Sequence, residues 1–154
     1  MSQIKAKHTG PELKLRRCLS KLGLQYRLHK NDVPGRPDVV FTREKIAVFC
    51  DGDFWHGRQW EKRKTSGQFC VRKKYWCAKI EDNIRRDRRI NRKLRDQGWT
   101  VLRYWATDIE TKGHMIAWEI TLILRAKQRH RKKPMILKCW ISRTKLKMEG
   151  VRCI

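Results

Sequence analysis

Two short apolar runs are the most regular feature of the hydrophobic pattern. Val39-Val40-Phe41 follows the turn-forming sequence Pro34-Gly35-Arg36-Pro37-Asp38, and Ile46-Ala47-Val48-Phe49-Cys50 precedes Asp51-Gly52-Asp53. Apolar, β-branched runs bounded by turn formers indicate buried strands. Because only the polar segment 42–45 separates the two runs, we expect them to pair as a hairpin. Asp38 would then lie close to the acids and the histidine that follow the second strand.

Helical periodicity predicts three helices. The first follows Thr9-Gly10-Pro11-Glu12, a capping-box pattern with Glu three residues after the N-cap Thr, and ends at Gly23. The second is a long helix over about 75–97, stopped by Gly98. The third extends over about 115–127. The apolar stripe of the long helix includes Asp87, a carboxylate that needs a defined partner if it is buried.

The remaining segments complete an α/β pattern. Alternation of Leu24, Tyr26 and Leu28 with polar residues predicts a half-buried strand, and 99–105 predicts another. Segment 58–74 is expected to be an exposed loop anchored by Trp60 and Phe69, with stacking on bases as the alternative. The order helix, three strands, helix, strand, helix predicts a small mixed central sheet flanked by helices.

We assign residues 1–130 to this domain and 131–154 to a basic C-terminal tail. The tail has no predicted fold: disorder, a path along nucleic acid and an added edge strand all stay open.

The net charge of the chain indicates what kind of partner it binds. The chain has 39 Lys and Arg against 15 Asp and Glu, a formal charge of +24, which attracts a polyanion through counterion release. Nucleic acid is therefore the expected partner. No apolar run approaches the roughly 18 residues of a spanning helix and no signal peptide is recognisable, so we expect a cytoplasmic protein with no membrane partner. The cysteines are expected to be reduced, with Cys70 and Cys77 as a less favoured zinc pair.

Acids and a histidine at the ends of the hairpin suggest phosphodiester hydrolysis. A carboxylate such as Asp38 can hold Mg²⁺ on a phosphate, and a histidine such as His56 can activate water. Plainer interpretations remain at two other positions. Glu12 can simply cap the first helix, and Asp87 can pair with a neighbouring arginine. As a bare pattern, Pro-Asp is common turn chemistry and does not identify an enzyme.

Several motifs occur together in a fixed order. They are Met1-Ser2-Gln3-Ile4, Thr9-Gly10-Pro11-Glu12, Pro34-Gly35-Arg36-Pro37-Asp38, Gly52-Asp53-Phe54-Trp55-His56, Asn83 with Arg86-Asp87-Arg88-Arg89, and Gly98-Trp99 through Trp105. In this arrangement the chain resembles the very short patch repair endonucleases, of the PD-(D/E)XK nuclease fold group. That family nicks DNA beside the thymine of a T:G mismatch. The resemblance implies a restriction-endonuclease-like fold and a metal-dependent endodeoxyribonuclease.

The resemblance also implies a role for each candidate site residue. Asp38 matches the carboxylate that binds the catalytic Mg²⁺, two ions in all, and Cys50 matches a position that gives its backbone carbonyl to a metal. His56 matches the general base, Asp87 the carboxylate that orients it, and Glu12 a further acid near the metal centre.

The implied DNA contacts come from aromatic and basic residues. Phe54 and Trp55 match an aromatic wedge that enters the DNA beside the mismatch, and Met1 matches a third intercalating side chain. Arg36, Arg86 and Arg88 in the matching motifs complete the expected DNA-binding set. The implied partners are T:G-mismatched double-stranded DNA and mismatch-repair proteins, with the chain itself a monomer.

Two departures from the family pattern affect metals. Asp51 stands where the best-studied members have histidine, so it adds negative charge or a further metal ligand. The family's structural zinc uses Cys and His, whereas the matching positions here are Asp53, Arg58, Trp60 and Thr107, so no zinc is expected. Two alternatives stay open: a site- or modification-specific nuclease of a restriction or mobile-element system, and a basic nucleic-acid-binding module that does not cut.

Overall fold

A β-hairpin forms the centre of the computed structural model, which describes residues 8–65 and 73–148. Strand β1 (Val39–Phe41) pairs antiparallel with β2 (Ile46–Asp51), with Val39 opposite Val48 and Phe41 opposite Ile46. Every residue of β1 is buried, as expected for a strand covered on both faces. The predicted hairpin is confirmed.

The third strand enters the sheet from a helical crossover. β3 (Thr100–Trp105) pairs parallel with β2, and the strand order is β1-β2-β3. Helix α3 (Lys73–Asp96) connects the two parallel strands, which require such a crossover. This small mixed sheet with flanking helices confirms the predicted α/β class.

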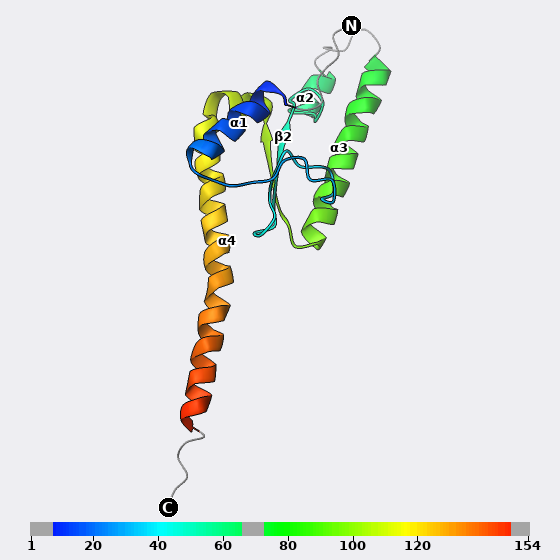
Figure 1. The fold of residues 1–154 in the computed structure, drawn as a ribbon. Coiled ribbons are helices and arrows are strands. Elements are labelled where there is room, and N and C mark those ends of the chain that lie inside the picture. The colour runs from blue at the N-terminus through cyan, green and yellow to red at the C-terminus, as the bar shows by residue number, and fades with distance from the viewer. Residues whose placement is uncertain (1–7, 66–72, 149–154) are drawn as a thin grey trace, which may run out of the picture. The chain divides into compact units, whose positions relative to one another are not determined.

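Helix α3 covers one face of the sheet. Its Leu94 is fully buried and belongs to one core cluster with Val40, Ala47 and Phe49 of the hairpin. Gly35 fits against this helix only because it lacks a side chain: a Cβ there would lie 2.5 Å from a methyl carbon of Ile90. Figure 1 shows α1 on the side of the sheet opposite to α3.

Helix α1 (Gly10–Lys21) starts where the sequence predicts, but its cap differs. Thr9 is the N-cap residue and its side chain makes no capping bond; instead its hydroxyl donates to Glu12 Oε1 at 3.0 Å. The reciprocal capping box is therefore wrong. Glu12 instead accepts from the Thr9 hydroxyl, the His8 N–H and Arg16, all of them near neighbours in the sequence.

Two loop expectations need correction. The segment containing Leu24, Tyr26 and Leu28 forms no strand, only an isolated bridge between Arg27 and Val40. Leu24 and Tyr26 are half-buried, whereas Leu28 is 41% exposed. The loop predicted over 58–74 contains a short helix, α2 (Trp60–Thr65).

The anchoring role of Trp60 is confirmed. Its side chain is buried and belongs to one cluster with Ile80. Phe69 and Cys70 lie outside the described residues.

Helix α4 (Ala106–Met148) is longer than the predicted 115–127. Its backbone leaves helical geometry at Lys112, with φ −127° and ψ 24°. Residues 131–148, part of the tail for which the sequence predicts no fold, continue this helix. By contact density the chain divides into two compact units, 1–118 and 119–154. No helix in the described parts of the chain is long and apolar enough to cross a membrane.

Candidate active site

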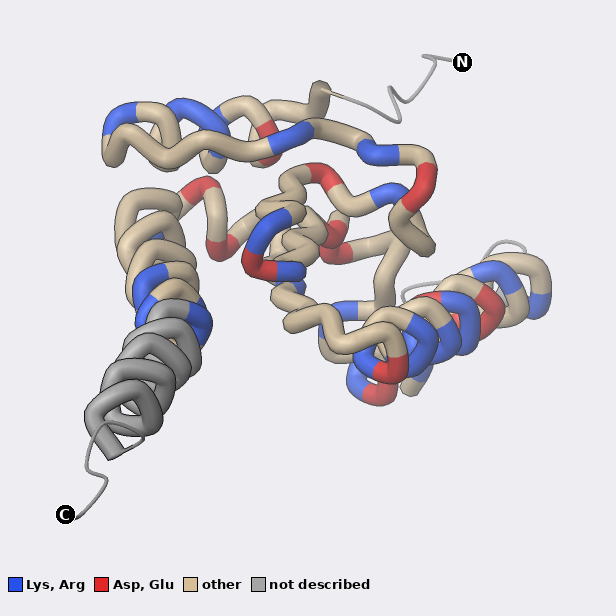
Figure 2. Tube along the Cα trace, turned by 60° about the horizontal axis from the view of Figure 1, so that its bottom comes forward, with Lys and Arg blue, Asp and Glu red and all other residues tan. Residues whose placement is uncertain are grey.

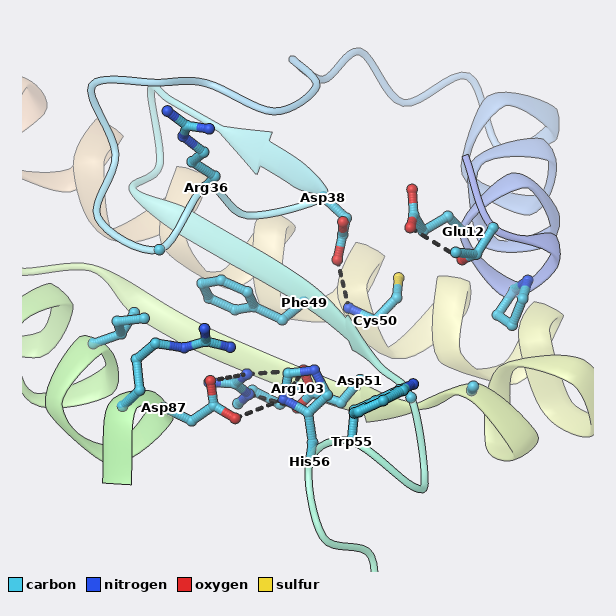
Figure 3. Close-up of a pocket in the computed structure, with 17 residues that line it drawn as sticks. Glu12, Arg36, Asp38, Phe49, Cys50, Asp51, Trp55, His56, Asp87 and Arg103 are labelled. Atoms are coloured by element: carbon cyan, nitrogen blue, oxygen red, sulfur yellow. Dashed lines mark hydrogen bonds and ion pairs between the residues drawn. The ribbon is translucent and has the colours of Figure 1, made fainter. Parts of the chain in front are cut away.

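An open pocket of about 830 Å³ lies within the first unit, where β1 begins and β2 ends. Its lining brings together the residues that the sequence singled out from three separate elements and their loops (Figure 3): Glu12, Arg36, Asp38, Asp51, His56 and Asp87. Cys50 also lines this space. The pocket is therefore the candidate active site.

Asp38 stands at the entrance to β1 and points at β2. Its Oδ2 accepts the Cys50 N–H at 2.7 Å, and its side chain is 18% exposed. Burial is the main reason why the pKa of Asp38 rises to about 6, with the charge of Glu12 as a further cause. Burial also raises the pKa of the Cys50 thiol far above its usual range, so the Cys50 side chain is a neutral thiol in the metal-free protein.

Glu12 is tied to α1 by charge rather than by a helix cap. Its Oε2 accepts from Arg16 Nη2 at 2.9 Å and from the His8 N–H at 3.0 Å. Glu12 and Arg16 are both nearly inaccessible, 4% and 7% exposed. A carboxylate buried this deeply needs such a partner.

His29 is a site residue that the sequence did not suggest. Its Nε2 lies 2.9 Å from Arg16 Nη2, which can only donate, and its Nδ1 lies 3.9 Å from Asp38 Oδ1. Nε2 therefore accepts, so the proton of the neutral ring is on Nδ1, the nitrogen that faces Asp38. His29 links the Glu12–Arg16 pair to Asp38. His29 lies in an irregular loop, where its φ is 43°. No periodic pattern in the sequence marks this position.

The structure brings His56 and Asp87 together from different elements. His56 Nδ1 lies 2.6 Å from Asp87 Oδ2. Burial pushes the pKa of Asp87 upward, but the hydrogen bond from His56 and the charge of Arg103 outweigh it and hold that pKa below its usual range. An ionised Asp87 accepts the Nδ1 proton, so Nε2 is the nitrogen that can take a proton.

Helix α3 also fixes the loop that carries His56. The side-chain amide of Asn83 donates to the Trp55 carbonyl at 3.0 Å. Gly57 has φ +73°, and a Cβ at this position would lie 2.6 Å from Ile84 Cδ1. Only glycine combines this conformation with such close packing. The loop is thus seated on the helix that supplies Asp87.

Asp51 does not point freely into the pocket. Both of its carboxylate oxygens accept from Arg103 of β3, at 2.5 and 2.8 Å, and Figure 3 shows this pair beside Asp87 and His56. Arg103 is a further residue of the pocket that was not predicted. Its signal was available: a charged residue in the middle of the otherwise apolar run Val101-Leu102-Arg103-Tyr104-Trp105.

An aromatic cluster adjoins the pocket. The Phe54 and Trp55 ring centroids lie 5.1 Å apart, and both rings contact Trp76 of α3, at 5.6 and 5.8 Å. Tyr75 follows at 5.2 Å from Trp76 and is 56% exposed. The predicted wedge residues therefore lie at the surface within a larger aromatic cluster. Trp76 and Tyr75 were not predicted to belong to it, because the irregular segment 58–74 separates them in sequence from Phe54 and Trp55.

The predicted basic contacts occupy two places. Arg36 and Arg86 are exposed and line the pocket. Arg88 is exposed on α3 outside the pocket, on a helix along which Lys and Arg predominate (Figure 2). Met1 lies outside the described residues.

Known proteins resemble this chain over most of its length. The family profile described as DNA mismatch endonuclease Vsr matches residues 1–62. The chain is 41% identical to the type II nicking enzyme V.NmeDIP of Neisseria meningitidis serogroup C, over 83% of this chain and 85% of that protein. It is 41% identical to the type II nicking enzyme V.HpaIIP of Haemophilus parainfluenzae, over 75% and 81%. It is 34% identical to the DNA mismatch endonuclease Vsr of Escherichia coli, over 68% and 65%.

The chain belongs to the Vsr endonuclease family. This membership confirms the resemblance drawn from the motifs and the predicted enzyme class, a DNA endonuclease.

Three of the four positions that the family resemblance matched to zinc ligands, Asp53, Arg58 and Thr107, take part in an ion-pair and hydrogen-bond network. Arg58 donates from Nη1 to Asp53 Oδ1 at 2.8 Å and from Nη2 to Asp108 Oδ1 at 2.9 Å. The Thr107 N–H donates to Asp53 Oδ2 at 3.1 Å. We call Asp53, Arg58, Thr107 and Asp108 the loop clip. It joins the Phe54–His56 loop to the start of α4.

Proposed function

We propose that this Vsr family member is a Mg²⁺-dependent endonuclease that nicks one strand of double-stranded DNA at a T:G mismatch. The observation that carries the proposal is one pocket holding a buried carboxylate, Asp38, and a carboxylate-oriented histidine, His56, beside an exposed aromatic cluster. Acid, base and a DNA-facing surface are the parts that strand cleavage requires.

The side chains present suit a magnesium site with few protein ligands. Among residues 8–65 and 73–148, no three His, Cys, Asp or Glu side chains gather at metal-binding geometry. Mg²⁺ needs no such cage, because it keeps several waters and takes one or two carboxylates plus phosphate oxygens. Asp38 and the Cys50 carbonyl would hold it, and a second ion would depend on DNA phosphates. When bound, the ion supplies positive charge at the scissile phosphate.

His56 is suited to act as the general base. Asp87 holds the ring by Nδ1 at 2.6 Å, so the ring orientation is fixed and Nε2 can take a proton from the attacking water. Asp87 stays ionised because its pKa is lowered, and its charge stabilises the imidazolium that forms. His56 and Asp87 would thus handle the proton of the attacking water, whereas the metal would act on the phosphate.

Exposed aromatic rings support mismatch recognition. Unstacking a mismatched step costs about a few kcal/mol, and flat apolar side chains can occupy the opened step. Phe54 is 36% exposed and packs edge-on against Trp55, which lines the pocket. A base step opened by these rings would therefore lie close to Asp38 and His56. Lys and Arg on α3 would contact the backbone.

A second candidate follows from the names of the relatives. V.NmeDIP and V.HpaIIP are type II nicking enzymes by name. A nuclease of a restriction system that recognises a site or a modification would use the same catalytic residues. It would differ in what the aromatic cluster and the arginines contact.

Strand-specific nicking assays separate the two. Duplexes with T:G or matched pairs, each in a set of flanking sequences, are incubated with Mg²⁺ or chelator and labelled on either strand. We expect Mg²⁺-dependent nicks only in the mismatched set and only in the thymine strand. Equal nicking of matched sites would favour the second candidate, and nicking in chelator would exclude the metal.

A further inference from the structure

Arg103 is held at the back of the pocket by polar groups on its edge and an aromatic ring on its face. Nε and Nη2 donate to both Asp51 oxygens, at 2.5 and 2.8 Å. Nη2 also lies 3.1 Å from Asp87 Oδ1, and Nη1 donates to Asn91 Oδ1 at 3.0 Å. Its Cζ lies 4.6 Å from the centroid of the Phe49 ring. A planar cation with these contacts has little freedom to reorient.

Asp51 is therefore a compensated charge. It is 6% exposed, so its carboxylate has lost most of its water and depends on the guanidinium. The two-pronged arrangement engages both oxygens. A divalent cation could bind Asp51 only by displacing a positive charge that is always present.

The other acids that line the pocket are also paired with a cationic side chain, except Asp38. Asp87 gives Oδ1 to Arg103 and Oδ2 to His56. Glu12 is paired with Arg16 at 2.9 Å. Asp38 instead accepts a backbone N–H and has His29 at 3.9 Å as its nearest ion-pair partner in the described chain.

We propose that Arg103 is an internal cation that reserves Asp51 for the protein and thereby directs a divalent metal to Asp38 alone. Arg103 is thus a positioning residue: it sets which carboxylate a metal can use and holds Asp87 in place for His56. This inference rests on the proposed function, because it concerns the metal of that site. It assigns Asp51 to ion pairing rather than to the metal.

Calcium titration of the full chain without DNA tests the proposal. Ca²⁺ supports binding studies without the need for cleavage, and calorimetry reports affinity and stoichiometry. Wild type should bind Ca²⁺ weakly. Arg103→Gln removes the charge and keeps a donor for Asp51; it should bind Ca²⁺ about tenfold or more tightly, because a nearby carboxylate becomes available. Arg103→Gln with Asp51→Asn should return to the wild-type affinity.

Arg86→Met is the matched control. Arg86 lines the same pocket and carries the same charge, but its side chain is exposed and makes no bond to Asp51. Its loss should change Ca²⁺ affinity less than about threefold, since an exposed charge is screened. An equal gain in Ca²⁺ affinity in Arg86→Met would mean that the net charge of the pocket, and not the pairing of Arg103 with Asp51, sets this affinity. That result would overturn the proposal. So would an unchanged affinity in Arg103→Gln, or a gain that persists after Asp51→Asn.

Loss of folding in Arg103→Gln is also decisive. In that case millimolar Ca²⁺ should restore the circular dichroism signal, because it replaces the missing cation, whereas Na⁺ at equal ionic strength should not. Failure of Ca²⁺ to restore it would refute the inference. The proposed function fails separately, if wild type with Mg²⁺ nicks no duplex, whatever the calcium titration gives.

Discussion

Asp38 and Asp51 invite comparison because they occupy neighbouring ends of the same hairpin and line the same pocket. Asp51 is paired with a guanidinium through both oxygens. Asp38 accepts one backbone N–H, and its pKa rises to about 6, chiefly through burial. One acid is stabilised by its surroundings and the other is not.

This difference matches the roles that we propose, with Asp51 as a structural acid and Asp38 as the metal-binding one. A desolvated carboxylate without a strong partner destabilises the native state and gains most from a bound cation. A compensated carboxylate gains little from such a cation. The pocket thus combines one uncompensated acid with a rigid set of paired charges around it.

The largest expected effect is on cleavage by Asp38→Ala. Nicking should fall to background, because no other pocket acid lacks an arginine or histidine in direct contact. DNA binding should be retained or become tighter, since a negative charge facing phosphate is removed. Asp51→Asn should reduce nicking less. Gel-based nicking and binding assays with Mg²⁺ measure both, and cleavage by Asp38→Ala at wild-type rates would exclude Asp38 as the metal ligand.

His56 and Asp87 should show the next largest effect. His56→Ala should lose about 10²–10⁴-fold in rate, the usual contribution of a positioned base. Asp87→Asn should lose a large part of this, because an amide favours the wrong tautomer. The double variant should be little slower than His56→Ala, since the pair acts as a unit. Single-turnover cleavage rates of the two single variants and the double variant test this. If the two losses multiply in the double variant, Asp87 has a structural role instead.

Stability should respond with opposite sign at the two aspartates. The folded pKa of Asp38, about 6, exceeds its ordinary value of 3.8. Folding is therefore favoured while Asp38 is protonated, and stability is lost as pH rises from about 4 to 6. Asp38→Asn should stabilise the metal-free protein by up to about 3 kcal/mol at pH 7.5 and little at pH 4.

Asp51→Asn is the comparison for that measurement. It leaves Arg103 half-compensated in a buried setting, so it should lower stability at pH 7.5. Urea unfolding in chelator at both pH values measures the two variants. A destabilised Asp38→Asn would mean that its bond with the Cys50 N–H outweighs the desolvation.

The aromatic cluster should govern discrimination more than affinity. Replacing Phe54 and Trp55 by Ala should reduce the preference for T:G over matched duplex by about tenfold, because stacking on a base contributes roughly 1–3 kcal/mol. Salt-dependent binding, which Lys and Arg supply, should change less. Trp118→Ala, which removes a 51% exposed aromatic outside the cluster, is the control. Equal losses on both duplexes would assign Phe54 and Trp55 a packing role.

Local patterns were sufficient for the parts of the fold that depend on neighbours in sequence. The hairpin and α3 follow from apolar runs, turn formers and helical spacing. Helical spacing placed Asp87 on the inward stripe of that helix, but its pairing with His56 was implied by the family resemblance, since the pattern alone also allowed an arginine partner. The failed strand at Leu24–Leu28 shows the limit: alternation predicts a strand only when a partner strand is available, and here one bridge forms.

Charge partners could not be predicted because they join distant elements. Arg103 and Asp51 are 52 positions apart and meet through the register of β2 with β3. Arg16 and His29 meet around Glu12 through a loop with no regular pattern. Sequence identified the acids but not which of them would be compensated, and that is what separates Asp38 from Asp51.

The smallest effect is expected at the loop clip, where partial exposure limits the energy of each ion pair. Side chains of Arg58, Asp53 and Asp108 are 28%, 19% and 37% exposed, so Arg58→Met should change global stability little. The clip has no thiolate or imidazole, so we expect no structural zinc there. Chelator should leave the melting temperature of wild type unchanged.

The clip should act locally instead. Arg58→Met should lower the rate and the mismatch preference together, because the loop carrying Phe54, Trp55 and His56 loses its attachment to Asp108. Arg43→Met removes the same charge from the exposed turn of the hairpin and should leave the preference unchanged. Zinc analysis of chelator-washed protein completes the test: a stoichiometric, tightly held zinc would show that a metal rather than the Arg58 ion pairs holds this loop, with Cys70 and Cys77 the first ligands to examine.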